Sequence, residues 1–183
     1  MLYKVVIPEQ PVYMTKISMF AQYSFITIQG EKMNAIDLAK GSIAAIEADN
    51  FDFIRKNSTE DMVFNGPGGR SLDKKEFIAL FSALMKALPD CKFNATNFKQ
   101  VGDRVTYTNQ VSGTHTGVLD LHMPNVPVLQ PTNLHIHLPQ EPVTVYFRDG
   151  MFYRVDVGEV PGGGLNGILT QLSVRMPQTA SQQ

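Results

Sequence analysis

The sequence predicts an α+β fold in which helices cover one face of a curved antiparallel sheet and leave a cone-shaped cavity between the two layers. Apolar residues recur three or four positions apart over residues 34–88, which is the helical spacing. After Pro89 the spacing changes to two, which is typical of strands. Hydrophobic residues make up 43% of the 183 residues, enough for a substantial core.

Composition excludes several classes of protein. The chain has 16 Lys+Arg and 17 Asp+Glu, a net charge of -1, and no basic run longer than Lys74-Lys75. Nucleic-acid binders need a concentrated basic face, and a spanning helix needs about 18 apolar residues, so we expect neither a nucleic-acid nor a membrane partner.

The single cysteine, Cys91, rules out an intramolecular disulfide and a multi-cysteine zinc site. It is either a half-buried structural thiol or a nucleophile, and a lone thiol fits a cytoplasmic protein.

Residues 1–33 differ from the rest, because few charges interrupt a stretch rich in aromatic and aliphatic side chains. They form either an N-terminal extension (an extra strand or a disordered segment) or a targeting segment. An upstream start site, with Met33 opening the domain proper, would also produce such an extension. We therefore divide the chain into this extension, a domain over residues 34–176, and a polar tail over residues 177–183.

The helices are expected in the first half of the domain. Ile36, Ala39, Ile43 and Ile46 predict an amphipathic helix over Asn34–Asp49. A short second helix follows from Phe51 and ends near Asn57. A strand over residues 62–64 then meets the turn cluster of residues 65–69. The third helix starts near Asp73, where Asp73 and Glu76 have the spacing of a capping box, and Pro89 ends it.

The strands follow Pro89. Alternation predicts strands over residues 92–100, 104–116, 134–148 and 151–157, with tight turns at residues 101–103 and 149–150. A proline-punctuated loop occupies residues 123–131. The triplet Gly162-Gly163-Gly164 lacks the residues of a phosphate-binding loop and is interpreted as a flexible joint before a short helix.

Strand alternation also predicts which side chains line the cavity. Asn109 is the polar member of a face that it shares with Val105, Tyr107 and Val111. The remaining inward-facing residues are expected on the last two strands: His135, His137, Glu141, Val143, Val145, Phe147, Tyr153, Val155 and Val157.

Glu141 is the carboxylate of this inward set. Burial among apolar neighbours would raise its pKa into the range of a general base. The alternative is that Glu141, which follows Pro139-Gln140, sits at a solvated strand edge.

His135 and His137 could join a metal site or form a polar surface pair, and spacing shows no third ligand, so we expect no metal. His115 has either a structural role in its turn or a ligand contact.

An ordered set of short motifs extends over most of the domain. These are Leu88-Pro89-Asp90, Val101-Gly102-Asp103-Arg104-Val105, Gly113-Thr114-His115-Thr116-Gly117, Pro131-Thr132, Phe147-Arg148-Asp149-Gly150 and Gly167-Ile168-Leu169-Thr170-Gln171-Leu172. This set resembles the SnoaL-like polyketide cyclase (ester cyclase) family of the nuclear-transport-factor-two-like superfamily. The resemblance implies an α+β barrel with a deep apolar pocket for a small molecule, and a homodimer formed through the sheet.

The resemblance also implies a chemistry. Such cyclases close a ring by an intramolecular aldol reaction, without metal or organic cofactor, using an Asp, a His, a Gln and an Asn. In this sequence the Asp falls on Val157, the His on Val143 and the Gln on Glu141, whereas Asn65 matches its counterpart. Asp156 should face the opposite side of the strand from Val157 unless a bulge re-aims it. Glu159 could approach the mouth of the pocket.

Three functions remain open at this stage. The first is a cofactor-free cyclase, isomerase or lyase acting on an apolar carbonyl compound, with Glu141 or Asp156 as base and Asn65, Asn109 or Tyr153 as polar partner. The second is non-catalytic binding of a hydrophobic small molecule. The third is a dimeric interaction module with a vestigial pocket. An inward-facing carboxylate favours the first, and a pocket of at least ~300 Å³ argues against the third.

Overall fold

The computed structural model describes residues 33–123 and 126–172, so the predicted extension, apart from Met33, and the polar tail lie outside the described residues. The helices are α2 (Ala35–Glu47), α3 (Phe51–Asn57), α4 (Lys74–Ala87) and α5 (Gly164–Gln171). The strands are β1 (Ser58–Asn65), β2 (Ser71–Asp73), β3 (Thr96–Val101), β4 (Arg104–Asn109), β5 (Ser112–Thr114), β6 (His135–His137), β7 (Glu141–Arg148) and β8 (Met151–Val157). Within these described ranges, none of the helices combines the length and the apolar character needed to cross a membrane.

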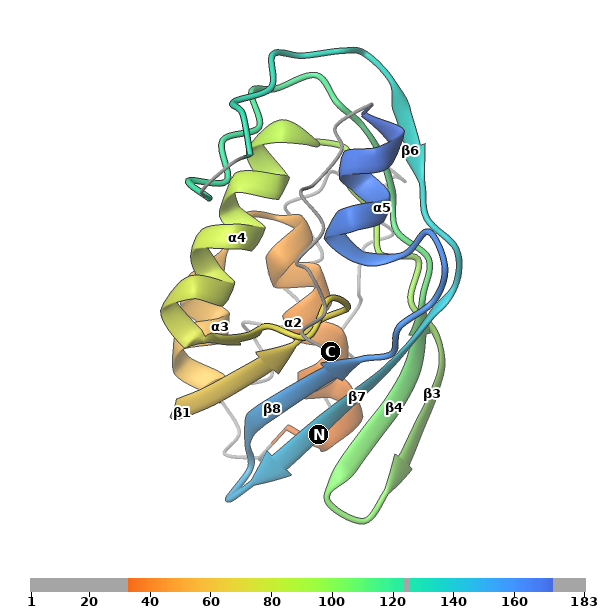
Figure 1. Cartoon of the computed structure of the whole chain (residues 1–183). Coiled ribbons are helices and arrows are strands. Elements are labelled where there is room, and N and C mark those ends of the chain that lie inside the picture. The colour runs from red at the N-terminus through yellow and green to blue at the C-terminus, as the bar shows by residue number, and fades with distance from the viewer. Residues whose placement is uncertain (1–32, 124–125, 173–183) are drawn as a thin grey trace, which may run out of the picture. The chain divides into compact units, whose positions relative to one another are not determined.

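Six strands form one curved sheet in the order β2-β1-β8-β7-β4-β3, and β5 pairs with β6 in a separate two-stranded sheet. The helices α2, α3 and α4 cover one face of the large sheet, and α5 lies near β6 (Figure 1). The core lies between these layers, because the apolar stripe of each helix and the inward side chains of the strands are buried against each other. The predicted α+β architecture is confirmed.

Local sequence signals determine where the long helices start. The Asn34 side chain accepts a hydrogen bond from the backbone N–H of Asp37 at 2.9 Å and caps α2. At α4, Asp73 and Glu76 form the predicted capping box, in which each side chain bonds the backbone N–H of the other. The chain leaves α4 just before Pro89, as expected from the restriction that proline places on the preceding residue.

Two predicted strands are each broken in the structure. The strand predicted over residues 104–116 divides into β4 and β5, and the one predicted over residues 134–148 divides into β6 and β7. Pro139 lies in the second break, and β5 and β6 leave the large sheet to pair with each other. In addition, β1 runs parallel to β8, so the sheet is mostly rather than wholly antiparallel. Alternation alone carries no information about such partners.

A β-bulge changes the facing of the last strand. On β7 and β8, Tyr146 pairs with Arg154, but the next residue, Phe147, pairs with Phe152, which leaves Tyr153 as an extra residue. Because of this extra residue, Phe152 is buried at the position of alternation that Tyr153 was expected to occupy. The bulge thus changes which aromatic ring of β8 reaches the core.

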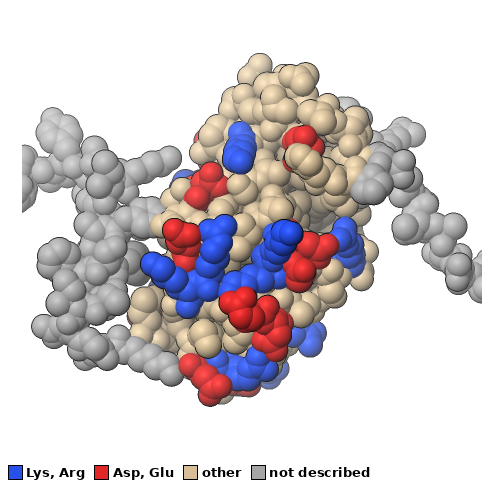
Figure 2. Space-filling model, turned by 90° about the vertical axis from the view of Figure 1, so that its left-hand side faces the viewer, with Lys and Arg blue, Asp and Glu red and all other residues tan. Residues whose placement is uncertain are grey.

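The face on the left-hand side of Figure 1 carries charges of both signs. Figure 2 shows Lys and Arg side chains interleaved there with Asp and Glu. Ion pairs account for part of this pattern, including Arg55–Asp52 at 2.8 Å and Lys74–Glu60 at 3.0 Å. The interleaving leaves no broad field of one sign on this face.

Candidate functional site

A cavity of about 1180 Å³ lies between the helices and the inner face of the large sheet. Its walls come from α2, α4 and α5 and from the inward side chains of β4, β7 and β8. Small-molecule sites usually enclose about 300–1,000 Å³, so this space is large enough for a ligand of several rings. A vestigial pocket would be much smaller.

The sheet wall of the cavity is arranged in rows, because strand register places side chains of neighbouring strands opposite each other. The first row is Asn109 on β4 opposite Glu141 on β7. The second row runs through Tyr107, Val143 and Val157, and the third includes Val145 and Val155. All seven of these side chains line the cavity. Apart from the Tyr107 hydroxyl in the second row, the polar groups in these three rows therefore lie at one end of the wall.

Four phenylalanines form an aromatic cluster on the cavity wall, with ring centroids of touching pairs 4.5 to 6.1 Å apart. The members of this cluster are Phe64 on β1, Phe77 and Phe81 on α4, and Phe93 before β3. Phe64 is the register neighbour of Val155, so the cluster continues the apolar rows of the sheet. Sequence reasoning missed Phe64 and Phe93 as lining residues, since they come from segments that meet only in the folded chain.

Glu141 is the buried carboxyl group of the cavity, and only 3% of the residue is exposed. Its Oε1 accepts a hydrogen bond from the backbone N–H of Gly164 at 2.8 Å, at the start of α5. Burial raises the pKa of Glu141, and the Gly164 hydrogen bond opposes that rise in pKa only partly. Of the two interpretations of Glu141, the structure supports the buried one.

Two further polar side chains reach the cavity beside Glu141. Asn109 is 7% exposed, and no described residue bonds its Oδ1. Tyr107 is buried and stacks on Phe98 with ring centroids 4.9 Å apart. Burial raises the pKa of the Tyr107 phenol, so this hydroxyl stays protonated at neutral pH and remains a hydrogen-bond donor.

The sequence profile described as SnoaL-like polyketide cyclase matches residues 36–140, which is more than half of the chain and includes the helical layer and β4. The chain belongs to the SnoaL-like polyketide cyclase family. No curated protein sequence matches it.

Solved structures show the same fold. AclR from Streptomyces galilaeus, a candidate hydroxylase, superposes with a TM-score of 0.59 and 20% identity, over 75% of this chain and 93% of its own. IdmH from Streptomyces antibioticus, a candidate polyketide cyclase, gives 0.57 and 19%, over 75% and 97%. A candidate SnoaL-like polyketide cyclase from Jannaschia sp. CCS1 gives 0.57 and 15%, over 80% and 100%. At these identities the similarity establishes the fold.

The sequence resemblance concerns three positions in the first two rows of the wall. The three positions on which the sequence resemblance places the Asp, His and Gln of such cyclases, Val157, Val143 and Glu141, all line the cavity. Val143 and Val157 are register partners, and Glu141 lies two residues before Val143 on the same face. Aliphatic side chains thus stand at two of the three positions, and the carboxyl group stands at the third.

Asp156 and Asn65 are absent from the cavity lining. Asp156 faces the opposite side of β8 from Val157, as alternation predicts, so neither it nor Asn65 takes the place at the ligand that was considered for it. The Asn65 amide donates a hydrogen bond to Asp156 Oδ1 at 2.7 Å, and Arg154 Nε donates to the same oxygen at 2.8 Å. Partial burial raises the pKa of Asp156, but these hydrogen bonds outweigh it and hold the pKa below its usual value. Register is continuous between Arg154 and Val157, so no bulge re-aims Asp156.

Tyr153 and His137 also lie outside the cavity. The bulge places Tyr153 against Tyr146, with ring centroids 6.3 Å apart, and beneath the Arg148 guanidinium. His137 is exposed, because the break between β6 and β7 interrupts the alternation that was expected to turn it inward. Its Nε2 accepts a hydrogen bond from the Gln110 amide at 3.0 Å, and Leu138 lines the cavity instead.

His115 is fully buried but is absent from the cavity lining. The backbone N–H of Thr132 donates to its Nδ1 at 3.3 Å, and the Thr132 hydroxyl lies 3.0 Å from the same nitrogen. Its backbone also pairs with Leu134 and Asn133. Burial lowers the pKa of His115. The structural interpretation of this residue therefore fits, since neutral His115 joins the two ends of the loop over residues 115–134.

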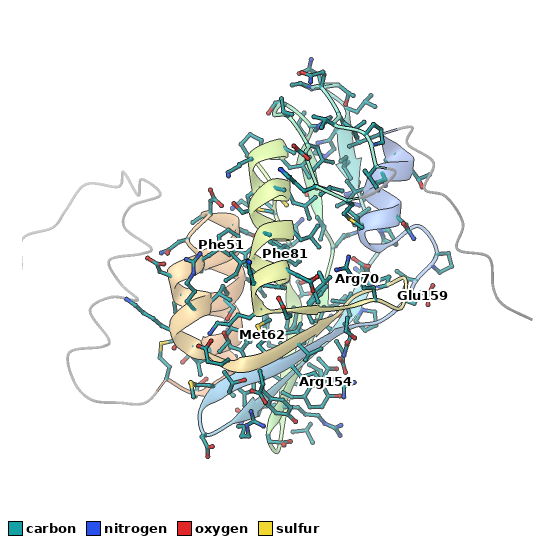
Figure 3. All side chains as sticks on the ribbon, turned by 60° about the vertical axis from the view of Figure 1, so that its left-hand side comes forward. Phe51, Met62, Arg70, Phe81, Arg154 and Glu159 are labelled. Atoms are coloured by element: carbon teal, nitrogen blue, oxygen red, sulfur yellow. The ribbon has the colours of Figure 1, made fainter. Side chains whose placement is uncertain are left out.

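The remaining candidate residues do not add a reactive group to the cavity wall beside Glu141. Cys91 is buried, and burial raises the pKa of its thiol to about 12, which keeps it protonated and unreactive. Glu159 is exposed beside a smaller cavity of about 630 Å³ near Gly162 and Gly163. Arg70, an exposed residue of the main cavity lining, is paired with Glu76. Figure 3 shows Arg70 and Glu159 at the same end of the domain, and Arg154 on the outer side of the sheet.

Within residues 33–123 and 126–172, no three His, Cys, Asp or Glu side chains come together in a geometry that could hold a metal ion. The histidine pair on β6 faces outward, and each imidazole of that pair has a hydrogen-bonding neighbour, Thr114 for His135 and Gln110 for His137.

Proposed function

We propose that this SnoaL-like protein is a cofactor-independent enzyme that exchanges protons at carbon next to a carbonyl group, with Glu141 as general base and acid. The observation that carries the proposal is a carboxyl group with a raised pKa, buried in the wall of a cavity large enough for a multi-ring ligand. A carboxylate of raised pKa is a stronger base than a solvated one, and general acid-base catalysis of this kind contributes about 10²–10⁴-fold to a rate.

The chemistry balances without an added reactant. The Glu141 carboxylate takes the proton from the carbon, the C–H electron pair forms the enolate, and the negative charge develops on the carbonyl oxygen. The Tyr107 hydroxyl is the donor that we assign to this oxygen, since it stays protonated and lines the adjacent row. Return of the proton to another carbon is isomerisation, whereas attack of the enolate on a second carbonyl group of the same molecule is ring closure.

Proton exchange can be tested without knowledge of the natural substrate. We expect the wild type to accelerate solvent deuterium exchange next to the carbonyl group of 2-tetralone, followed by NMR in D₂O. Glu141→Gln keeps the size and the Oε1 acceptor for Gly164 but cannot take a proton, and should lower the rate by about 10²-fold or more. Asp156→Asn, on the outer face of the sheet, is the matched control and should exchange at the wild-type rate.

Equal exchange rates for Glu141→Gln and the wild type would contradict the assignment of Glu141 as the base. A wild type that binds 2-tetralone but does not accelerate exchange would support the second candidate function, non-catalytic binding of a hydrophobic molecule. The observation that favours this second candidate is the largely apolar wall, which includes the four-phenylalanine cluster.

A further inference from the structure

The side-chain oxygen of Asn109 is a buried acceptor that lacks a partner. The residue is 7% exposed, lines the cavity, and has no bond to Oδ1 from the described residues. Leaving such a group unpaired in the folded protein is unfavourable, so native structures rarely keep one without a reason. A valine or leucine at this position would extend the apolar rows at no such cost. The unpaired oxygen therefore indicates a donor that is supplied from within the cavity.

Asn109 also has a defined position relative to the proposed base. It is the register partner of Glu141 on the neighbouring strand, with both side chains on the cavity face. The Cβ atoms of such partners are about 5 Å apart, so one ligand group at Asn109 stands next to another at Glu141. Beyond this polar pair the wall turns apolar at Val143 and Val157.

We propose that Asn109 is a specificity-determining residue whose Oδ1 accepts a hydrogen bond from a hydroxyl group of the ligand. The ligand class that fits is an apolar ring compound with a hydroxyl group close to the atom that faces Glu141. The ring body packs against the valine rows and the phenylalanine cluster, while the hydroxyl end reaches the Asn109–Glu141 row. The position of the hydroxyl relative to the reacting carbon rests on the proposed function, but the hydroxyl preference itself does not.

A water molecule in the cavity can donate to the same oxygen. A ligand hydroxyl that displaces this water preserves its hydrogen bond, whereas a methyl ether of the same shape cannot. The comparison of a phenol with its methyl ether therefore isolates the role of Asn109. The chain has no Trp, so naphthalene fluorescence can be followed without an indole background.

The experiment measures the affinities of 2-naphthol and 2-methoxynaphthalene by fluorescence titration at neutral pH. A hydrogen bond of about 1.4 kcal/mol corresponds to a tenfold preference, so we expect the wild type to bind 2-naphthol about tenfold more tightly than its ether. Asn109→Leu should bind both probes equally, and its retained affinity for 2-methoxynaphthalene shows that the variant is folded. The control Asn65→Leu changes the same residue type on the outer face and should retain the preference.

A phenol preference that persists in Asn109→Leu would overturn the proposal, as would a wild type that binds the two probes equally or binds neither. The 2-tetralone exchange assay, in which Glu141→Gln is compared with the wild type, separates the proposed function from this proposal. A protein that prefers 2-naphthol but fails to exchange 2-tetralone protons retains the Asn109 assignment and loses the catalytic one. A protein with Glu141-dependent exchange but no phenol preference loses the Asn109 assignment alone.

Discussion

At the scale of single residues, Glu141 combines an ionisable group with an apolar environment. Its pKa is raised in the folded chain, so the folded state binds more protons than the unfolded state between the ordinary glutamate pKa and the raised one. Stability contributed by the protonated group is fully present below the ordinary pKa and is lost as pH rises through the raised value. Ionisation of Glu141 therefore lowers the stability of the fold as pH rises.

The raised pKa of Glu141 predicts how the substitution Glu141→Gln changes the stability of the fold. Because glutamine stays neutral and can still accept from Gly164, the variant should have a higher free energy of unfolding than the wild type at pH 8. The difference should shrink as pH falls towards 4. Urea denaturation at several pH values measures it, and comparison of two proteins that share every other titrating group isolates the contribution of residue 141. A variant less stable than the wild type at pH 8 would contradict the burial of an ionisable carboxyl group.

At the scale of elements, the start of α5 is built around the Glu141 carboxylate. A Cβ on Gly163 would come within 2.6 Å of Glu141 Oε1 and 2.7 Å of Val160 Cγ2, so this position accepts only glycine without movement. The neighbours Gly162 and Gly164 have positive φ angles of 78° and 60°, the region that glycine adopts at no steric cost. The triplet was predicted as a flexible joint. In the structure Gly163 packs directly against the buried Glu141 carboxylate, and Gly164 donates a hydrogen bond to it.

Substitution Gly163→Ala should move the carboxylate, lower stability by about 1–3 kcal/mol and lower the rate of 2-tetralone exchange. The matched control is Gly162→Ala, where nothing lies within 4 Å of the new Cβ. The control should cost only about 1 kcal/mol of backbone strain and leave exchange unchanged. Thermal unfolding measures the loss of stability, and the NMR exchange assay measures the rate. Equal exchange rates for both variants would show that Gly163 does not position Glu141.

At the scale of the whole molecule, the outer face of the sheet is the surface through which the family resemblance implies a homodimer. Thr144 lies near its centre, between its register partners Thr106 and Asp156. An arginine at a half-buried position on an open sheet face usually changes monomer stability by no more than about 0.5 kcal/mol.

We predict that sedimentation equilibrium finds a dimer for the wild type and a monomer of unchanged fold for Thr144→Arg. Ala48→Arg, at the exposed end of α2 in the helical layer, is the matched control and should remain dimeric. A wild type that sediments as a monomer at micromolar concentration, or a Thr144→Arg variant that stays dimeric, would contradict dimerisation through this face.

Sequence alone determined the features that depend on neighbours along the chain. The helical stripes, the Asp73–Glu76 capping box and the inward alternation of Tyr107, Asn109 and Glu141 all follow from local spacing and side-chain chemistry. The ordered motifs identified the family for the same reason, since each motif is a short local pattern.

Only the tertiary structure decided the features that depend on partners distant in the chain. The bulge at Tyr153, the break before β7 that leaves His137 outside, and the Asp156–Asn65 hydrogen bond all arise from pairing between separate strands. The phenylalanine cluster and the contact of Glu141 with α5 have the same origin. Alternation predicts on which side of its own strand a residue lies. Whether that side faces a cavity is decided by register and burial, because both depend on the whole fold.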